Sequence, residues 1–73
     1  MQPYANLSGN SGVESFKTDD ESITVKFRNN AKRYKYSAAQ NGSHIATMKQ
    51  LANSGKGLSA YIGKNKQILK FSF

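Results

Sequence analysis

The sequence predicts an α+β domain: a three- or four-stranded antiparallel sheet packed against one main α-helix plus a short helical turn. Three observations predict this class. Apolar and polar residues alternate over residues 22–28 and again over 66–73, apolar residues recur at helical spacing over 44–54, and 73 residues suffice for one small core.

Residues 1–12 are rich in Asn, Ser and Gly and have no apolar periodicity, so we expect a flexible N-terminal arm ahead of a single domain over residues 13–73. A first strand is predicted over residues 13–18. Its apolar residues, Val13 and Phe16, lie three positions apart, which departs from the period of two that a strand favours.

The clearest strand follows an acidic turn at residues 19–21 and spans residues 22–28. Its apolar members are Ile23, Val25 and Phe27, and its polar members are Thr24, Lys26 and Arg28. Asn29-Asn30 comes next, and asparagine tolerates the positive φ that a two-residue hairpin turn requires. We therefore expect a return strand immediately after this turn.

A two-residue turn fixes the register of the hairpin. The expected pairs are Arg28 with Ala31, Phe27 with Lys32, Lys26 with Arg33, Val25 with Tyr34, Thr24 with Lys35 and Ile23 with Tyr36. Tyr34 and Tyr36 then join the apolar face, where aromatic rings pair well with β-branched residues. The register favours packing of both rings beneath the helix, and stacking of the rings on bases stays an open alternative.

The opposite face of the hairpin is basic, and no aromatic residue is expected on it. Directly opposed like charges such as Lys26 and Arg33 cost stability. Either a polyanion partner or Glu14 of the neighbouring first strand compensates this cost. The candidate nucleic-acid-binding residues are Lys26, Arg28, Arg33, Lys35 and, from the later segment SGKG, Lys56.

A loop is predicted over residues 37–42 and the main helix over residues 44–54. Ser43 is the expected N-cap, and Gly55 suits the left-handed C′ position that ends a helix. The apolar stripe of this helix consists of Ile45, Met48, Leu51 and Ala52.

A second, shorter helical element is expected after the glycines, where the apolar residues are Leu58, Tyr61 and Ile62. The alternation over residues 66–73 predicts a late strand that covers a sheet edge. Leu69, Phe71 and Phe73 lie on one side of this strand, and Ile68, Lys70 and Ser72 lie on the other.

Charge is the strongest global signal, because 11 Lys and Arg oppose 4 Asp and Glu, for a formal charge of +7. Such an excess favours nucleic acid or another polyanion as partner. There is no cysteine, and the single histidine, His44, has no acidic, Ser or Cys partner in the sequence that suggests catalysis. We therefore expect no metal, cofactor, small-molecule substrate or enzymatic activity. We also expect neither a signal peptide nor a membrane span, and a cytoplasmic location.

The order of these motifs resembles the KTSC domain, a short bacterial module named for the C-terminus of some lysyl-tRNA synthetases. The resemblance covers about residues 13–62, and SAAQNGS stands where the family usually has a Val-Pro before its helix. The family's features are matched by Ile23, Val25 and Phe27, by the Tyr-x-Tyr of Tyr34 and Tyr36, and by Ser54, Gly55, Lys56 and Ile62. RNA binding has been suggested for this family, and the resemblance implies it here.

Two function hypotheses follow. The first is a non-enzymatic module that binds RNA or other nucleic acid non-specifically through a basic sheet face. The second is a protein-interaction or structural accessory domain, homodimeric through a sheet edge. One continuous basic patch favours the first hypothesis. Scattered positive charge with exposed Leu69, Phe71 and Phe73 favours the second.

Overall fold

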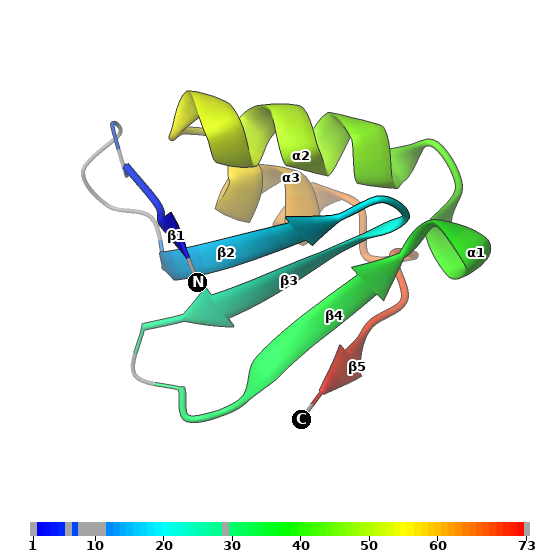
Figure 1. The fold of residues 1–73 in the computed structure, drawn as a ribbon, viewed down its shortest axis with the longest axis horizontal. Coiled ribbons are helices and arrows are strands. Elements are labelled where there is room, and N and C mark those ends of the chain that lie inside the picture. Colours follow the sequence, from blue (N-terminus) through cyan, green and yellow to red (C-terminus); the bar gives the residue numbers. More distant parts are fainter. Residues whose placement is uncertain (1, 6, 8–11, 29, 73) are drawn as a thin grey trace.

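A computed structural model of the chain describes residues 2–5, 7, 12–28 and 30–72. Within these ranges, five antiparallel strands form one sheet in the order of the sequence, and three helices accompany it (Figure 1). The α+β class is therefore confirmed. The elements are β1 (Gln2–Pro3), β2 (Val13–Asp19), β3 (Ser22–Phe27), β4 (Arg33–Ser37), α1 (Ala38–Asn41), α2 (His44–Ser54), α3 (Leu58–Lys64) and β5 (Phe71–Ser72).

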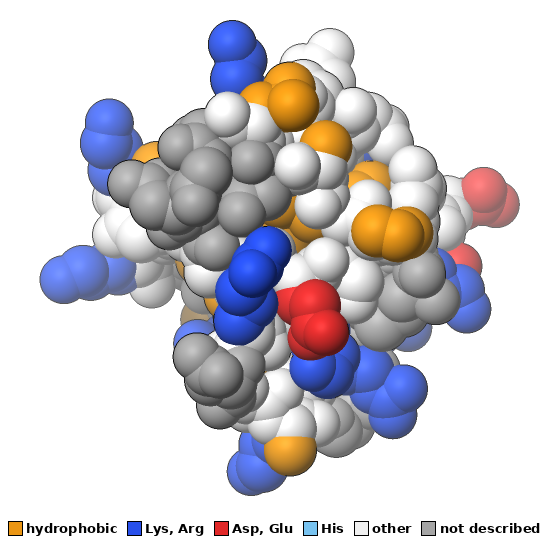
Figure 2. Space-filling view, turned by 90° about the vertical axis from the view of Figure 1, so that its left-hand side faces the viewer, with side chains coloured by type: hydrophobic (Ala, Val, Ile, Leu, Met, Phe, Trp, Pro, Cys, Tyr) orange, Lys and Arg blue, Asp and Glu red, His pale blue; other side chains and the backbone are white. Residues whose placement is uncertain are grey.

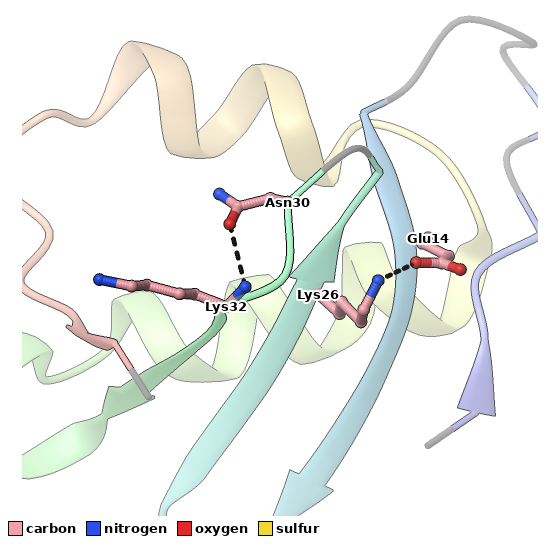
Figure 3. Close-up of polar contacts among 4 residues, drawn as sticks. All are labelled: Glu14, Lys26, Asn30 and Lys32. Atoms are coloured by element: carbon pink, nitrogen blue, oxygen red, sulfur yellow. Dashed lines mark hydrogen bonds and ion pairs between the residues drawn. The ribbon is translucent and has the colours of Figure 1, made fainter.

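The register of the central hairpin is confirmed from Lys26 opposite Arg33 to Ile23 opposite Tyr36. Among the described residues the β3–β4 ladder ends at Lys26 and Arg33, so the connection is longer than the predicted two-residue turn. Asn30 stabilises this longer connection, because its side-chain oxygen accepts a hydrogen bond from the Lys32 amide at 3.0 Å (Figure 3). Asn29, the other predicted turn residue, lies outside the described residues.

A β-bulge in β2 explains the irregular spacing of its apolar residues. Val13 pairs with Phe27 and Ser15 pairs with Lys26, so Glu14 is an additional residue in β2. Because of this insertion, Val13 and Phe16 point to the same face although they lie three positions apart, and both are fully buried.

Helices α2 and α3 cover one face of the sheet (Figure 1). Ile45, Met48 and Ala52 of α2 are buried, as the predicted stripe requires, and Leu51 is half-buried. Leu58 of α3 joins them. The rest of the core comes from the sheet and its ends, through Tyr4, Val13, Phe16, Ile23, Val25, Tyr36 and Ile68.

The ends of α2 differ in how well the sequence predicted them. Gly55 ends the helix at φ 80°, in the left-handed conformation that was expected. Ser43 is not a side-chain cap, because its backbone is already helical (φ −66°, ψ −14°) and its hydroxyl caps no amide. Part of the predicted loop at 37–42 is instead the single turn α1, which Gly42 (φ 58°, ψ −131°) separates from Ser43.

The sheet begins before the boundary predicted at residue 13. Gln2 and Pro3 pair with Phe16 and Ser15 as the edge strand β1, where the missing N–H of proline is tolerated. Tyr4 is buried, and its hydroxyl accepts a hydrogen bond from the Leu58 amide at 3.3 Å. The described part of residues 1–12 therefore differs from the expected flexible arm.

The late strand β5 pairs with the outer edge of β4, as predicted, but only over Phe71 and Ser72. Ile68 is the buried side chain of this segment, whereas Leu69 is 54% exposed and Phe71 is 65% exposed. Phe73 lies outside the described residues. No helix in the described part of the chain is both long and apolar enough to cross a membrane.

Candidate nucleic-acid interface

The face of the sheet opposite α2 and α3 carries the candidate site, and we call it the open face. Residues paired across neighbouring strands point to the same side of a sheet, so the register assigns each residue to a face. The described residues of the open face from β2 to β5 include Ser15, Lys17, Thr24, Lys26, Arg33, Lys35 and Phe71.

The register brings three of the predicted site residues together. Lys26 lies directly opposite Arg33, and Lys35 follows Arg33 by two positions on the same strand and the same face. Arg28 lies just beyond β3, where its amide donates a hydrogen bond to the Gly12 carbonyl at 2.7 Å. Arg28 is exposed, and its charge acts on Glu14 of the open face.

Glu14 forms an ion pair with Lys26 on this face (Figure 3). The hydrogen bond from Lys26 and its positive charge hold the pKa of Glu14 below its ordinary value, and the charge of Arg28 adds a smaller effect in the same direction. The sequence left two partners open for compensating the opposed charges of Lys26 and Arg33, a polyanion or Glu14. In the structure, Glu14 forms an ion pair with Lys26.

Lys56 does not belong to the open face. It lies in the turn between α2 and α3, on the side of the sheet that the helices cover, where its carbonyl accepts a hydrogen bond from the Ser54 hydroxyl at 3.4 Å. The SGKG segment ends α2 and leads into α3, so Lys56 is carried by a turn between helices and not by a strand of the open face.

Two residues of the open face were missed by the sequence reasoning. Lys17 pairs with Thr24, and Phe71 pairs with Lys35, so these four residues form one row across β2, β3, β4 and β5. The described open-face residues of the hairpin strands include no aromatic ring, as expected, and β5 adds Phe71 beside them. The alternation around Phe71 was visible in the sequence, but its face depends on which strand β5 pairs with.

Charge is distributed unevenly along the strands. Asp19, Asp20 and Glu21 gather at the β2–β3 turn, whereas the opposite end of the sheet carries Lys26, Arg28, Lys32 and Arg33. Figure 2 shows basic side chains projecting on several sides of the molecule, with an acidic side chain in contact with basic ones near the centre of that view. The basic residues therefore extend beyond the open face.

The tyrosines of the Tyr-x-Tyr pair have structural contacts on the helix side of the sheet. Tyr36 is 1% exposed and belongs to the core. Tyr34 is half-buried: its ring meets Phe27 edge-on at 5.8 Å, its hydroxyl accepts a hydrogen bond from Asn30 at 2.9 Å, and the Lys70 ammonium lies 4.8 Å from its centroid. Packing, rather than base stacking, accounts for both rings.

Ser54 and Gly55 also have structural roles. The Ser54 hydroxyl donates to the Leu51 carbonyl at 2.9 Å at the end of α2. Gly55 is buried, and its carbonyl accepts a hydrogen bond from the Leu7 amide at 2.7 Å. A Cβ added at Gly55 would lie 2.5 Å from the Cβ of Ala5, so the N-terminal segment packs where only glycine leaves room.

The hydroxyl of Tyr36 is buried and has no hydrogen-bond partner among the described residues. Burial raises the pKa of Tyr36 to about 12, with a smaller contribution from Tyr34. His44 contacts the Tyr61 hydroxyl through its Nδ1 at 2.6 Å, which ties the start of α2 to α3. No group of three His, Cys, Asp or Glu in the described ranges is arranged to hold a metal ion.

An open depression beside the β2–β3 turn is lined by polar residues, including Asp20, Lys35 and Lys49. Lys49 of α2 donates hydrogen bonds to the carbonyls of Asp19 and Asp20, the latter at 3.0 Å. Lys49 therefore stabilises the β2–β3 turn. The depression borders the acidic end of the sheet, which makes it a poor site for an anion.

Comparison of the chain with protein-family models finds no match, and comparisons with curated proteins and with solved structures find no significant match. The resemblance to the KTSC domain stays a prediction.

Proposed function

We propose that this domain is a non-enzymatic module that binds nucleic acid through the open face of its sheet. One observation carries the proposal: the row Lys17, Thr24, Lys35 and Phe71 sets two exposed lysines and an exposed aromatic ring on the open face, around the buried Thr24. Lys and Arg neutralise phosphates, and an aromatic ring offers a base a stacking surface.

The charge balance of this face supports a polyanion as ligand. Lys17, Lys26, Arg33 and Lys35 share the face with two described carboxylates, Glu14 beside Lys26 and Asp19 at the β2–β3 turn. Contacts from four cations predict that the logarithm of the binding constant falls with the logarithm of salt concentration at a slope of about −3. Sequence preference is expected to be weak, because phosphate contacts are the same at every base.

Titration of labelled RNA and DNA oligonucleotides with the protein tests this proposal. The expected result is tight binding at about 50 mM salt and an affinity about 50-fold lower at about 200 mM. Arg33→Glu and Lys35→Glu are expected to weaken binding about tenfold or more at the lower salt concentration. Absence of binding at low salt would overturn the proposal.

Lys56→Glu is the matched control, because it makes the same change in net charge on the helix side of the sheet. The open-face proposal requires this variant to bind nearly as well as the unmodified protein. If Lys56→Glu lowers the affinity as much as Lys35→Glu does, net charge alone governs binding and the open face is not the site.

A second candidate function, a protein-interaction domain, is favoured by two features that were expected of it: basic residues that extend beyond the open face, and exposed apolar residues at the β5 edge. Leu69 is 54% exposed and Phe71 is 65% exposed, and an edge strand offers backbone groups for pairing with another chain. A homodimer that pairs β5 with β5 buries both side chains. Light scattering coupled to size-exclusion chromatography tests it: a monomer at all concentrations contradicts this candidate, and a dimer that Phe71→Asp dissociates supports it.

A further inference from the structure

We propose that the ligand of the open face is single-stranded nucleic acid, with one unpaired base stacked on the ring of Phe71. This inference rests on the proposed function and names the ligand class. Phe71 lies directly opposite Lys35, and directly opposed residues of an antiparallel pair have Cβ atoms about 5 Å apart. A nucleotide stacked on the ring therefore has its phosphate within reach of the Lys35 ammonium.

Hydrogen bonds from the side chain of Asn41 fix the backbone just before Phe71. The side-chain amide of Asn41 donates to the Leu69 carbonyl at 2.8 Å, and its oxygen accepts from the Leu69 amide at 2.7 Å. Asn41 itself is buried, and its amide also donates to the Ser37 carbonyl at 3.1 Å. These bonds position the backbone two residues before Phe71.

Side-chain packing on the helix side further fixes the orientation of β5. Ile68 is buried in the core, and the Lys70 ammonium lies 4.8 Å from the centroid of the Tyr34 ring. Because successive side chains of an extended chain alternate, the engagement of Lys70 with Tyr34 directs Phe71 to the open face. The 65% exposure of Phe71 is therefore set by its neighbours on both sides.

The shape of the surface favours single strands over duplexes. The major groove of a duplex admits a helix or a two-stranded ribbon, whereas this ring lies on the open face at the β5 edge of a five-stranded sheet. Bases in a duplex are stacked on both of their faces and have no face left for Phe71. An unpaired base has such a face, and stacking on aromatic rings of sheets is a recurring way to hold it.

The charges of the open face predict the direction in which the bound nucleic-acid strand runs, which is away from the acidic β2–β3 turn. From the Phe71–Lys35 pair, the open face continues along β4 to Arg33 and then to Lys26 opposite it. In the other direction lie Asp19, Asp20 and Glu21, which repel phosphate. The backbone of the ligand is therefore expected to run from Phe71 toward the β3–β4 connection.

The test compares oligo(dT) and oligo(U) of about 12 nucleotides with a hairpin duplex of similar length. The unmodified protein is expected to bind both single strands more tightly than the duplex. Phe71→Ala is expected to lower single-strand affinity about 5- to 150-fold, the range that loss of one base–aromatic stack produces, and to leave duplex affinity unchanged. Leu69→Ala removes a neighbouring exposed apolar side chain without a ring and is the matched control.

The outcomes separate this inference from the proposed function. If Arg33→Glu and Lys35→Glu weaken binding but Phe71→Ala does not, the stacking inference is overturned and the nucleic-acid interface stands. If no oligonucleotide binds at low salt, both fail.

A second measurement does not depend on affinity. The chain contains no tryptophan, so the Phe71→Trp variant has one indole, at the proposed stacking position. Stacking predicts that oligo(dT) and oligo(U) quench its fluorescence at saturation, and that the duplex does not. Equal quenching by duplex and single strand, or quenching by neither, contradicts a stacked base.

Discussion

The carboxylate of Glu14 accepts a hydrogen bond from the Lys26 ammonium, and the two form an ion pair on the open face. The bulge in β2 makes this contact possible, because it sets both Glu14 and Ser15 opposite Lys26. The carboxylate occupies the place beside Lys26 that a phosphate of the proposed ligand needs. Glu14 is therefore an internal competitor of that phosphate.

Replacing Glu14 by Gln is expected to raise affinity for single-stranded oligonucleotides about 2- to 5-fold at about 50 mM salt, because Lys26 is released from an exposed ion pair. The gain should shrink as salt screens the phosphate contacts. Fluorescence anisotropy at two salt concentrations measures both effects. Glu21→Gln, which makes the same charge change at the β2–β3 turn, is the control. An equal gain in both variants would mean that net charge, and not release of Lys26, controls affinity.

Tyr36→Phe is expected to leave stability at pH 7 unchanged or to raise it by up to about 1 kcal/mol, because the hydroxyl it removes is buried without a partner in the described structure. The free energies of unfolding of Tyr36→Phe and of the unmodified protein should differ more at alkaline pH. In the unfolded chain Tyr36 ionises near pH 10, whereas in the folded protein its pKa is about 12.

Between these two pKa values Tyr36 ionises in the unfolded chain but not in the folded protein, which lowers the free energy of unfolding. The contribution of Tyr36 to stability is therefore fully present below pH 10 and is lost as the pH rises to about 12. The variant lacks this component. Urea denaturation at a series of pH values measures the difference. Parallel stability profiles for the two proteins from pH 9 to pH 11 would contradict the shifted pKa.

Gly55→Ala is expected to destabilise the fold by about 1–3 kcal/mol, because alanine is strained at φ 80° and its Cβ would lie 2.5 Å from that of Ala5. Gly57→Ala is the control: its φ of 86° gives similar strain, but the nearest atom is the flexible end of Leu51 at 3.3 Å. Denaturant unfolding should give a larger loss at Gly55. Hydrogen exchange at the Leu7 amide should accelerate only in the Gly55 variant.

Asn41→Ala is expected to cost about 1–3 kcal/mol, because it leaves the carbonyl and amide of Leu69 without the side chain that satisfies them. Exchange of the Leu69 amide should become faster, and single-strand binding should weaken although no charge has changed. Gln40→Ala, an exposed neighbour on the same turn, should alter neither measurement. Unchanged protection of Leu69 would show that Asn41 does not hold β5.

Regular alternation and a helix ended by glycine made much of the fold predictable. The alternation around Val25 fixed the face of β3, and Gly55 marked the end of α2. Ser43 failed as a cap because its own backbone is already helical, which local residue preferences do not reveal. The strand β1 was missed because two residues give no period, and burial of Tyr4 depends on contacts with distant residues such as Leu58.

The candidate site was predictable only where it depends on local pairing. Lys26, Arg33 and Lys35 follow from one hairpin, so the sequence was enough to bring them together. Phe71 depends on β5 pairing with β4 across more than thirty residues of chain, and the face it takes is fixed by that long-range register. Lys56 was included on charge alone, which carries no information about the side of the sheet.

The bulge at Glu14 has a consequence for how this sequence tolerates insertions and deletions. Loss of most single residues within a strand inverts the faces of everything beyond it. Deletion of Glu14 is expected to keep the faces as they are, because it removes the additional residue of the bulge. Val13 and Phe16 become two positions apart, so that β2 has the period of a regular strand with the same residues on its buried face. One in-frame codon deletion is thus expected to remove the carboxylate beside Lys26 and to keep the β2–β3 pairing in register, at the cost of the hydrogen bond from the Tyr4 amide to the Glu14 carbonyl at 3.1 Å.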